Sequence, residues 1–418
     1  MNILVVGGGG REHAIVWKIA SQLKNGKIFA TPGNAGISEI ANSVDLISSD
    51  YEALAEFASS EGIDLTIVGP EIPLSEGIVD IFQRKGQKIF GPTQKASLLE
   101  SSKAWSKEFM VSEGVATGKF EICMDFESAK KSLERSSFPV VMKYDGLAAG
   151  KGVKIITEEA SGLLFLEDIF HHRLFASHNP KVLFEEYLVG DELSYLVITD
   201  GTSYLPLAST RDYKRICTGD RGPNTGGMGA YSPVPSFDRD LSSLIERRVV
   251  TPTLAGLQKH SIPYVGVLYF GIMITAEGPK LLEYNVRFGD PETQVILPRL
   301  KSDLIEVMEA SIEGTLHTCR LQWSDLAAVN VVLASAGYPK EYQKGFIIEG
   351  LDSLPSDILS FHAGTRRDGD DLLTDGGRVL NIVALDRTID RARKRVYEAL
   401  EKVRFEGKTY RTDIAQTV

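Results

Sequence analysis

The sequence predicts a soluble protein of several domains, with an α/β part followed by α+β parts. Three observations carry this prediction. The chain has 418 residues, which is too long for one compact core. Over the first hundred residues, apolar strand-like runs alternate with helical patterns, as in a doubly wound parallel sheet. Beyond that point the strand-like runs come in pairs, which is typical of antiparallel hairpins.

The N-terminal part, residues 1–101, begins with an apolar run at 3–6 that has the continuous hydrophobicity of a buried parallel strand. Four glycines follow it. The remaining elements predicted here are a helix over 14–23, a strand in KIFATPGN, a helix over 51–62, a strand over 64–68, a helix over 74–85 and a strand in KIFGP. Because a doubly wound sheet binds ligands outside the carboxyl ends of its strands, we expect a site beside the glycines.

The central part, residues 102–324, opens with a helix that has Ser at its cap. A Gly- and Pro-rich loop is predicted over 218–233 and a helix at about 238–259. The strands predicted in this part are FPVVMKYD, VKIIT, VLFEEYL, ELSYLVITDG, SYLPLAS, VGVLYFGIMIT and PKLLEYNVRF. The last part, residues 325–418, is predicted to be a small α+β domain with a strand in AAVNVVLAS and a helix over 390–403.

The composition disfavours several classes of protein. The chain carries 46 basic and 56 acidic residues, a net charge of −10, so phosphate-driven binding to nucleic acid is not expected. Cys123, Cys217 and Cys319 are widely spaced, which argues against a disulfide framework or a structural zinc site. No apolar run is long enough to span a bilayer, and the N-terminus reads as a strand and not as a signal peptide. We therefore expect a cytoplasmic protein that does not bind membranes.

The glycine-rich turn GGGGREH (residues 7–13) lies where a strand meets a helix. A dinucleotide fingerprint, G-x-G-x-x-G, would place its third glycine at Glu12 or His13, and no acid ends the second strand, so NAD is disfavoured. A helix N-terminus with free N–H groups favours an anion, and Arg11 suits a phosphate on a small substrate. A purely structural turn remains an alternative.

The segment KYDGLAAGKGV (residues 143–153) looks like a phosphate-binding loop. Its glycines are one residue too close for G-x-x-x-x-G-K-[ST], and Gly152 stands where Ser or Thr is needed. A strand follows it instead of a helix, so the pattern favours a hairpin lid over nucleotide phosphates, with Lys143 on the incoming strand and Lys151 at the tip. The alternative is a surface hairpin with incidental lysines.

Polar residues alternate with apolar ones over LLEYNVRF (residues 281–288). On a strand Glu283, Asn285 and Arg287 share one face, and Leu282, Tyr284, Val286 and Phe288 point into the core. A carboxylate and an amide oxygen are ligands suited to Mg²⁺, and Arg287 can hold an anion bidentately. A solvated strand face is the alternative, although the polar turn GDPE follows at once.

Two further segments are less specific. Glu192 follows the strand VLFEEYL and is a candidate acceptor for ribose hydroxyls, although paired acids at a strand end are often only solvated. The segment 211–231 has many small residues and glycines, so it can wrap a substrate closely or serve as a linker.

Together these segments resemble the ATP-grasp ligases, and in particular the glycinamide ribonucleotide synthetase family, over nearly the whole chain. The resemblance rests on GGGGREHA, TPGNAG (31–36), IVGPE (67–71), FGPT (90–93), KYDGLAAGKGV, GPNTGGMGAYSP, EYNVRFGDPETQ (283–294), AGYP (336–339) and FHAGT (361–365). It implies a central ATP-grasp domain with a lid subdomain at about 120–190. It also implies ATP-dependent ligation of glycine to 5-phosphoribosylamine through a glycyl phosphate, in purine synthesis, by a monomer or weak homo-oligomer.

The resemblance also assigns roles to residues. ATP would contact Lys103, Lys143, Gly150, Lys151, Glu185, Tyr187 and Glu192. Glu283 and Asn285 would hold Mg²⁺ or Mn²⁺. The catalytic set would be Asp212, Lys214, Arg287 and Asp290. The substrates would contact Gly8, Gly9, Gly10, Arg11, Glu71, Asn224, Thr225 and Gly226.

Three positions depart from the family pattern: Tyr144 and Arg221 replace small residues, and Phe346 replaces an acid. None of these changes removes a proposed ligand. Two other functions stay open from the sequence: a carboxylase of the biotin or aminoimidazole type, and a nucleotide-binding regulatory module without catalysis.

Overall fold

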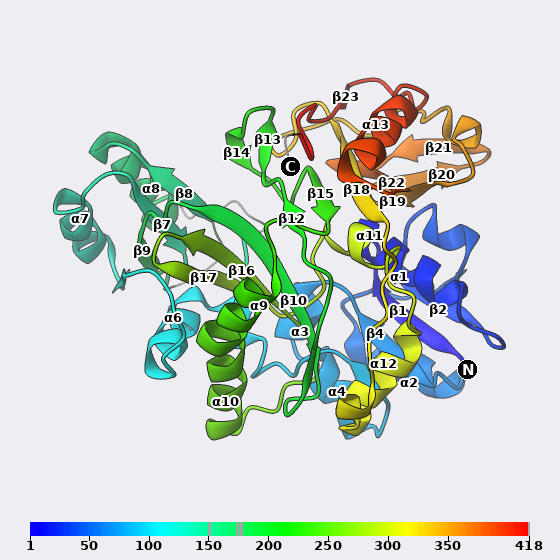
Figure 1. Cartoon of the computed structure of the whole chain (residues 1–418), viewed down its shortest axis with the longest axis horizontal. Helices are drawn as coiled ribbons and strands as arrows, with labels where there is room; N and C mark the ends of the chain where they lie inside the picture. The colour runs from blue at the N-terminus through cyan, green and yellow to red at the C-terminus, as the bar shows by residue number, and fades with distance from the viewer. Residues whose placement is uncertain (149–151, 173–174, 176–178, 417–418) are drawn as a thin grey trace.

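The computed structural model describes residues 1–148, 152–172, 175 and 179–416, which cover all the elements predicted from the sequence. In Figure 1 the blue N-terminal sheet and the orange-to-red C-terminal sheet lie on the right, and the lid strands with α7 and α8 lie on the left. The green central strands connect the two sides. Gly150 and Lys151, at the tip of the predicted hairpin, lie outside the described residues.

The N-terminal part is the predicted doubly wound sheet, with strand order β3-β2-β1-β4-β5 and parallel pairing throughout. Its strands are β1 Ile3–Gly7, β2 Ile28–Pro32, β3 Asn42–Ser43, β4 Leu65–Val68 and β5 Ile89–Phe90. Its helices are α1 Gly10–Ala20, α2 Tyr51–Ser60, α3 Glu71–Ser75 and α4 Ile78–Arg84. The carboxyl end of β1 lies at the position where the strand order reverses, which is the ligand edge of such a sheet.

The single helix predicted over 74–85 is wrong, because the segment forms α3 and α4. Gly77 separates them with φ 90°, a left-handed conformation that only glycine adopts without strain and that a continuous helix cannot contain. Helix α1 also begins earlier than predicted, at Gly10. Gly9 is its N-cap residue and donates its N–H to the Glu12 side chain, which completes the first turn.

The lid is a small antiparallel sheet of order β6-β9-β7-β8. It contains β6 Phe120–Cys123, β7 Val140–Tyr144, β8 Val153–Ile156 and β9 Val182–Glu186, with α7 Phe126–Glu134 and α8 Glu159–Phe170. Strands β7 and β8 pair antiparallel with Lys143 opposite Val153, which confirms the predicted hairpin. The lid has a hydrophobic core of its own, separate from the rest of the described chain.

Tyr144, the bulky departure beside Lys143, belongs to that core. Its side chain is buried and stacks on Phe175, with ring centroids 4.1 Å apart and an interplanar angle of 19°. Offset stacking of this kind adds to the burial of both rings. The bulk of Tyr144 therefore stabilises the lid sheet from within.

The central sheet has the order β11-β10-β16-β17 and packs through one core with the N-terminal sheet and α12. Its strands are β10 Asp191–Thr199, β11 Tyr204–Pro206, β16 Gly266–Thr275 and β17 Gly278–Asn285. The helices of the central part are α5 Leu98–Ser101, α6 Lys103–Ser112, α9 Arg239–Ile245, α10 Thr251–Lys259, α11 Thr293–Ile296 and α12 Leu304–Glu313. A π-helical stretch, Glu246–Val250, joins α9 to α10, so the predicted helix at about 238–259 is continuous.

The C-terminal sheet takes strands from two distant parts of the chain. Its order is β12-β15-β18-β22-β19, with β23 also on β18. These strands are β12 Arg211–Asp212, β15 Gly229–Ser232, β18 Ala327–Ser335, β19 Ile358–His362, β22 Arg378–Asp386 and β23 Lys408–Thr409. A separate hairpin, β20 Thr365–Asp368 with β21 Asp371–Thr374, and helix α13 Ile389–Leu400 complete the C-terminal part.

The loop predicted over 218–233 is therefore wrong in part. Strand β14, Arg221–Asn224, pairs with β13, Arg215–Cys217, and β15 is buried between β12 and β18. The glycines and proline hid these strands from the sequence pattern, because residues without bulky side chains lower the apparent strand propensity. The domain boundaries after residues 101 and 324 stay a prediction; the first lies between α5 and α6 and the second just before β18.

No helix in the described part of the chain is long and apolar enough to cross a membrane. Cys123, Cys217 and Cys319 are all free thiols.

Candidate active site

A cavity of about 1370 Å³ opens where the lid, the central sheet, the N-terminal sheet and the C-terminal sheet meet. Each of these units contributes to its walls, for example through Lys143 of the lid, Glu283 of β17, Arg11 of α1 and Arg378 of β22. The predicted site residues that line it are Gly8, Gly9, Arg11, Glu71, Lys103, Lys143, Glu185, Tyr187, Glu192, Asp212, Lys214, Asn224, Thr225, Gly226, Glu283, Asn285, Arg287 and Asp290. Of the predicted residues that the structure describes, Gly10 alone is not part of the wall.

One wall of the cavity carries buried lysines around Glu185. The Glu185 carboxylate lies 3.0 Å from the Lys143 ammonium and 2.9 Å from that of Lys107. Burial by itself raises the pKa of Glu185, but the two lysines lower it below its ordinary value, so the group is ionised. Burial lowers the pKa of Lys107 to about 8. Lys107 was missed, although it follows Lys103 by one helical turn on the same face of α6.

Lys103 lies at the junction of this wall with the lid. Its ammonium donates to the carbonyl of Gly146, 2.7 Å away, in the chain that leaves β7. Burial lowers the pKa of Lys103, and the nearby carboxylate of Glu283 opposes that shift. Lys103 and Lys143 thus place two cations in the cavity wall, one from α6 and one from the lid.

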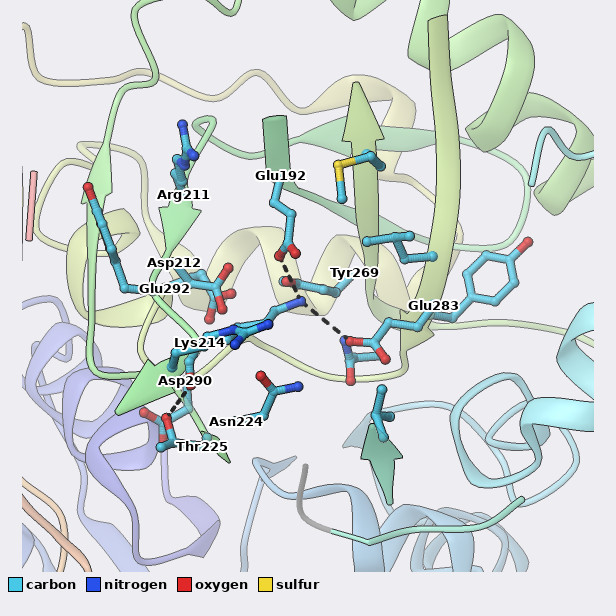
Figure 2. Close-up of a pocket in the computed structure, with 18 of the residues that line it drawn as sticks. Glu192, Arg211, Asp212, Lys214, Asn224, Thr225, Tyr269, Glu283, Asp290 and Glu292 are labelled. Atoms are coloured by element: carbon cyan, nitrogen blue, oxygen red, sulfur yellow. Dashed lines mark hydrogen bonds and ion pairs between the residues drawn. The ribbon is translucent and has the colours of Figure 1, made fainter. Parts of the chain in front are cut away.

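On the opposite side, Lys214 lies between two carboxylates of the central sheet (Figure 2). Its ammonium is 3.3 Å from Glu192 and 3.7 Å from Glu283. Burial lowers the pKa of Lys214, but Glu192 and Asp212 outweigh it and raise the pKa well above its ordinary value. Asp212 lies beside it, and burial together with its acidic neighbours raises its pKa to about 7. This side of the site therefore holds a fixed cation, Lys214, next to a carboxyl group, Asp212, that can exchange a proton near neutral pH.

Strand β17 brings Glu283 and Asn285 into the cavity as predicted. Tyr284, Val286 and Phe288 are buried, and Tyr284 also borders the cavity. The prediction for Leu282 is wrong, because it lines the cavity while Leu281 is fully buried. A β-bulge is the reason: Gly271 of β16 faces Glu283 and the next residue faces Leu281, so Leu282 is extra. Leu281 and the residues before it in β17 therefore point to the opposite faces from those that simple alternation predicts.

The pair Glu283 and Asn285 fits a divalent cation that keeps other ligands from water and nucleotide. Burial raises the pKa of Glu283, but Lys214, Lys143 and Lys103 hold it below its ordinary value, so the carboxylate is ionised. Within the described residues no group of three or more His, Cys, Asp or Glu could hold an ion by itself. A site of one carboxylate and one amide oxygen suits Mg²⁺ bound with nucleotide phosphates better than a dedicated protein cage.

Arg287 follows β17 and is held between two carboxylates. Its guanidinium lies 3.1 Å from Glu71 of α3 and 3.1 Å from Glu100 of α5. Burial raises the pKa of Glu100 to about 7, whereas Arg287 and Arg11 hold that of Glu71 at about 2 against the effect of burial. Glu100 was missed, because nothing in LLESSKAW marks it as facing a site 187 residues later.

The glycine-rich turn before α1 is shaped around Glu12. The Gly9 N–H donates to the Glu12 carboxylate at 2.7 Å, and a Cβ on Gly7 or Gly69 would lie 2.5 Å or less from that side chain. Glu12 also accepts from Arg11 Nε at 2.6 Å, while Arg11 Nη1 donates to the carbonyl of Phe288. Glu12 was missed, and it occupies part of the anion site expected at this helix N-terminus. Gly10 packs tightly against Asn381 and Gln294 of neighbouring elements instead of lining the cavity.

The last wall combines the loop at Asn224, Thr225 and Gly226 with Asp290, and two residues of the C-terminal part contact it. The Arg378 guanidinium lies 3.1 Å from the Asp290 carboxylate, and Tyr338 accepts from the Gly226 N–H. Burial raises the pKa of Asp290, but Arg378 and Arg11 hold it below its ordinary value. Tyr338 lies in AGYP (336–339), which carried the resemblance but was given no role in the site, and no pattern in the sequence marks Arg378.

The two antiparallel sheets that border the cavity, with lysines on one side and oxygen ligands on the other, lie in a segment, residues 101–293, that matches the model of an ATP-grasp domain. ATP-grasp enzymes use ATP with Mg²⁺ or Mn²⁺. The chain belongs to the phosphoribosylglycinamide synthetase family. Models of that family's N domain, ATP-grasp (A) domain and C domain match residues 1–100, 101–293 and 328–417.

Known proteins resemble the chain over its whole length. A phosphoribosylamine–glycine ligase of Caldanaerobacter subterraneus is 46% identical over 415 residues, which cover 99% of each chain. The crystal structure of a phosphoribosylamine–glycine ligase from Thermotoga maritima matches with a TM-score of 0.86 and 34% identity, over 99% of this chain and 100% of that one. The biotin carboxylase domain of Hydrogenobacter thermophilus 2-oxoglutarate carboxylase, solved with MgADP, matches at 18% identity and a TM-score of 0.73, over 98% and 91% of the two chains. This last likeness extends to the fold alone.

Proposed function

We propose that the protein joins glycine to 5-phosphoribosylamine and converts ATP to ADP and phosphate, giving glycinamide ribonucleotide for purine biosynthesis. The observation that carries this proposal is the full-length likeness to phosphoribosylamine–glycine ligases, at 46% and 34% identity in the two cases above. Lys103 and Lys143, proposed to contact ATP, and Glu283 and Asn285, proposed to bind the metal, all line the cavity. Their presence favours an enzyme over a regulatory module without catalysis.

The first half-reaction activates glycine. A carboxylate is a poor electrophile, so we propose that its oxygen takes the γ-phosphoryl group of ATP and forms glycyl phosphate. Lys103 and Lys143 would neutralise the phosphates from the α6 and lid side, and Glu185, Tyr187 and Glu192 would border the adenosine. Glu283 and Asn285 would hold Mg²⁺ or Mn²⁺, which supplies charge neutralisation at the phosphates when bound. Arg287 and Asp290 would orient glycine.

In the second half-reaction the ribosyl amine attacks the acyl carbon, and phosphate leaves. The amine nitrogen gains a positive charge as the C–N bond forms and must lose a proton. Asp212 lines the cavity beside Lys214, and its pKa, raised by burial to about 7, suits the transfer of that proton. The residues Gly8, Gly9, Arg11 and Glu71 would bind the phosphoribosyl group at the carboxyl edge of the N-terminal sheet.

Water must be excluded between the two steps, because acyl phosphates hydrolyse. Described residues of β7, β8 and the loop Asn224–Gly226 line the cavity, and we propose that these segments keep water from the acyl phosphate. The proposal also includes a cytoplasmic location, where a reducing environment suits three free thiols, and a monomer or weak homo-oligomer.

The test is ADP release by the purified protein with Mg²⁺. We expect ADP only when glycine and 5-phosphoribosylamine are both present, together with glycinamide ribonucleotide in equal amount. A carboxylase of the biotin or aminoimidazole type would instead release ADP with bicarbonate. ADP formation that depends on bicarbonate and not on glycine would refute the proposal.

A further inference from the structure

We propose that Arg378 of the C-terminal sheet is a positioning residue for the substrate half of the site, because it fixes Asp290 and the loop 225–227 in one arrangement. This inference rests on the proposed function and extends it to a residue and a unit of the chain that have no role in it so far. The occupants of the wall that Arg378 organises would be glycine and the ribosyl amine.

Arg378 stands at the beginning of β22 and reaches into the cavity with a side chain that is 20% exposed. Its Nη2 lies 3.1 Å from the Asp290 carboxylate, and its Nη1 donates to the Asp290 carbonyl at 2.9 Å. The same Nη1 donates to the carbonyl of Gly226 at 2.6 Å and lies 3.4 Å from that of Gly227. One planar guanidinium therefore ties two segments that are more than sixty residues apart in sequence.

The Gly226 residue is held on both of its polar groups. Its carbonyl accepts from Arg378, and its N–H donates to the Tyr338 hydroxyl at 3.1 Å. A Cβ at Gly226 would lie 2.9 Å from the Arg378 Cζ, and one at Gly227 would lie 2.3 Å from Pro291. At Gly226 and Gly227 the loop thus packs so closely against Arg378 and the Asp290 turn that a Cβ at either position would require a neighbour to shift.

The loop transmits this arrangement to the reacting groups. Thr225 donates to the Lys214 carbonyl through its N–H at 2.8 Å and through its hydroxyl at 2.7 Å. Arg378 thereby sets the position of Asp290 directly and that of Lys214 through one further contact. No hydrogen bond or ion pair of the described residues joins Arg378 to Lys103, Lys143 or Glu185 on the nucleotide wall.

The experiment compares R378A and R378K with a matched control, R395A. Arg395 of α13 also contacts a carbonyl and two carboxylates, those of Leu385, Asp357 and Asp386, but it does not line the cavity. For R378A we expect kcat/KM for glycine and for the amine to fall about 100-fold, the loss typical of reacting groups displaced by about 1 Å. The KM for ATP should change about tenfold less. R378K keeps the charge beside Asp290 but lacks the planar fork, so we expect an intermediate loss.

A chemical rescue separates positioning from mere stability. Because Arg378 borders the cavity, added guanidinium at millimolar concentration can enter the space left in R378A and should restore part of kcat. Sodium chloride at equal ionic strength should restore none. R395A should keep wild-type kinetics, with or without guanidinium.

The inference is overturned if R378A and R378K keep the kinetics of R395A, or if R378A loses ATP binding as strongly as substrate binding and guanidinium restores nothing. If R378A fails to fold, R378K provides the test: kcat/KM for glycine and the amine should fall more than the KM for ATP changes. Failure of the proposed function is distinguishable, since the wild-type protein would then form no ADP with glycine and the amine.

Discussion

The Glu100 carboxylate lies 3.1 Å from the Arg287 guanidinium, in the wall between the N-terminal sheet and β17. Glu100 also accepts from the Val286 N–H at 2.7 Å, so it fixes the backbone as well as the side chain of this segment. Because Glu71 holds the other side of the same guanidinium, two carboxylates share one cation. Arg287 can therefore bind a substrate anion most readily when one of these carboxyl groups is neutral.

The first prediction concerns stability and pH at Glu100. Burial raises its pKa from 4.5 to about 7, so its contribution to stability is fully present below pH 4.5 and is lost as the pH rises through 7. Glu100→Gln removes this dependence. The free energy of unfolding of the variant, minus that of wild type, should therefore rise by about 3 kcal/mol between pH 4.5 and pH 8. Urea unfolding across that range measures it. The exposed Glu406→Gln is the control, and a stability difference that does not change with pH would contradict the prediction.

The second prediction concerns acid stability at His362, which lies against His13 with ring centroids 5.5 Å apart. Burial lowers the pKa of His362 to about 4 and that of His13 to about 3, so both are neutral in the folded protein. Their contribution is present above the unfolded pKa of 6.5 and is lost as the pH falls toward 4.

The free energy of unfolding of His362→Gln should therefore fall by about 3 kcal/mol less than that of wild type between pH 7 and pH 4. Urea unfolding measures this difference. His317→Gln, at an exposed position, should follow the wild-type curve. Parallel curves for wild type and His362→Gln would remove the histidine from the explanation.

The third prediction concerns Lys107, which shares Glu185 with Lys143. If Lys143 contacts a phosphate of ATP, as proposed above, its hold on Glu185 weakens and Lys107 remains as the counter-ion of Glu185. Lys107→Met leaves Lys143 as the remaining partner of the buried Glu185 carboxylate. We therefore expect Lys143 to stay paired with Glu185 and the Kd for ATP to rise about tenfold. Calorimetric titration measures the Kd, with the exposed Lys95→Met as control. An unchanged Kd in a folded Lys107→Met protein would show that Lys143 does not need this partner.

The fourth prediction concerns the metal at Glu283. Glu283→Gln keeps the shape of the side chain and an oxygen ligand but removes its charge, so Mn²⁺ should bind about tenfold more weakly in the presence of an ATP analogue. Electron paramagnetic resonance of Mn²⁺ measures binding without turnover. Glu277→Gln, in the turn between β16 and β17, is the control. Equal Mn²⁺ affinity in both variants would place the metal elsewhere.

The architecture could be predicted from the sequence wherever one periodicity dominates. The parallel N-terminal sheet and the β7–β8 hairpin have continuous apolar runs, and turn residues separate their elements. The bulge at Leu282 could not be predicted, because alternation looks regular until the partner strand is known. The strands β14 and β15 were hidden for a related reason: their pairing partners, and not their own residues, make them strands.

The candidate site divides in the same way. Residues such as Glu283 and Lys143 stand in motifs whose spacing suggests chemistry, and the structure brings both to one cavity. Residues such as Glu100 and Arg378 act through contacts across the chain, so no local pattern distinguishes them from surface charges. Their partners are set by tertiary packing, which a single sequence does not show.

The pairing of β12 and β15 with β18 has a consequence for the order in which the protein is made. These two strands leave the ribosome well before β18. They can pair with each other, but until β18 is made the other edge of β15 has no partner in the sheet. Asp212 belongs to β12, and the loop 225–227 leads into β15, so the substrate half of the site takes shape last. A chain interrupted before β18 would still contain Asp212 and the loop 225–227, but it would lack the strand that holds β15, and with it β12, in the sheet.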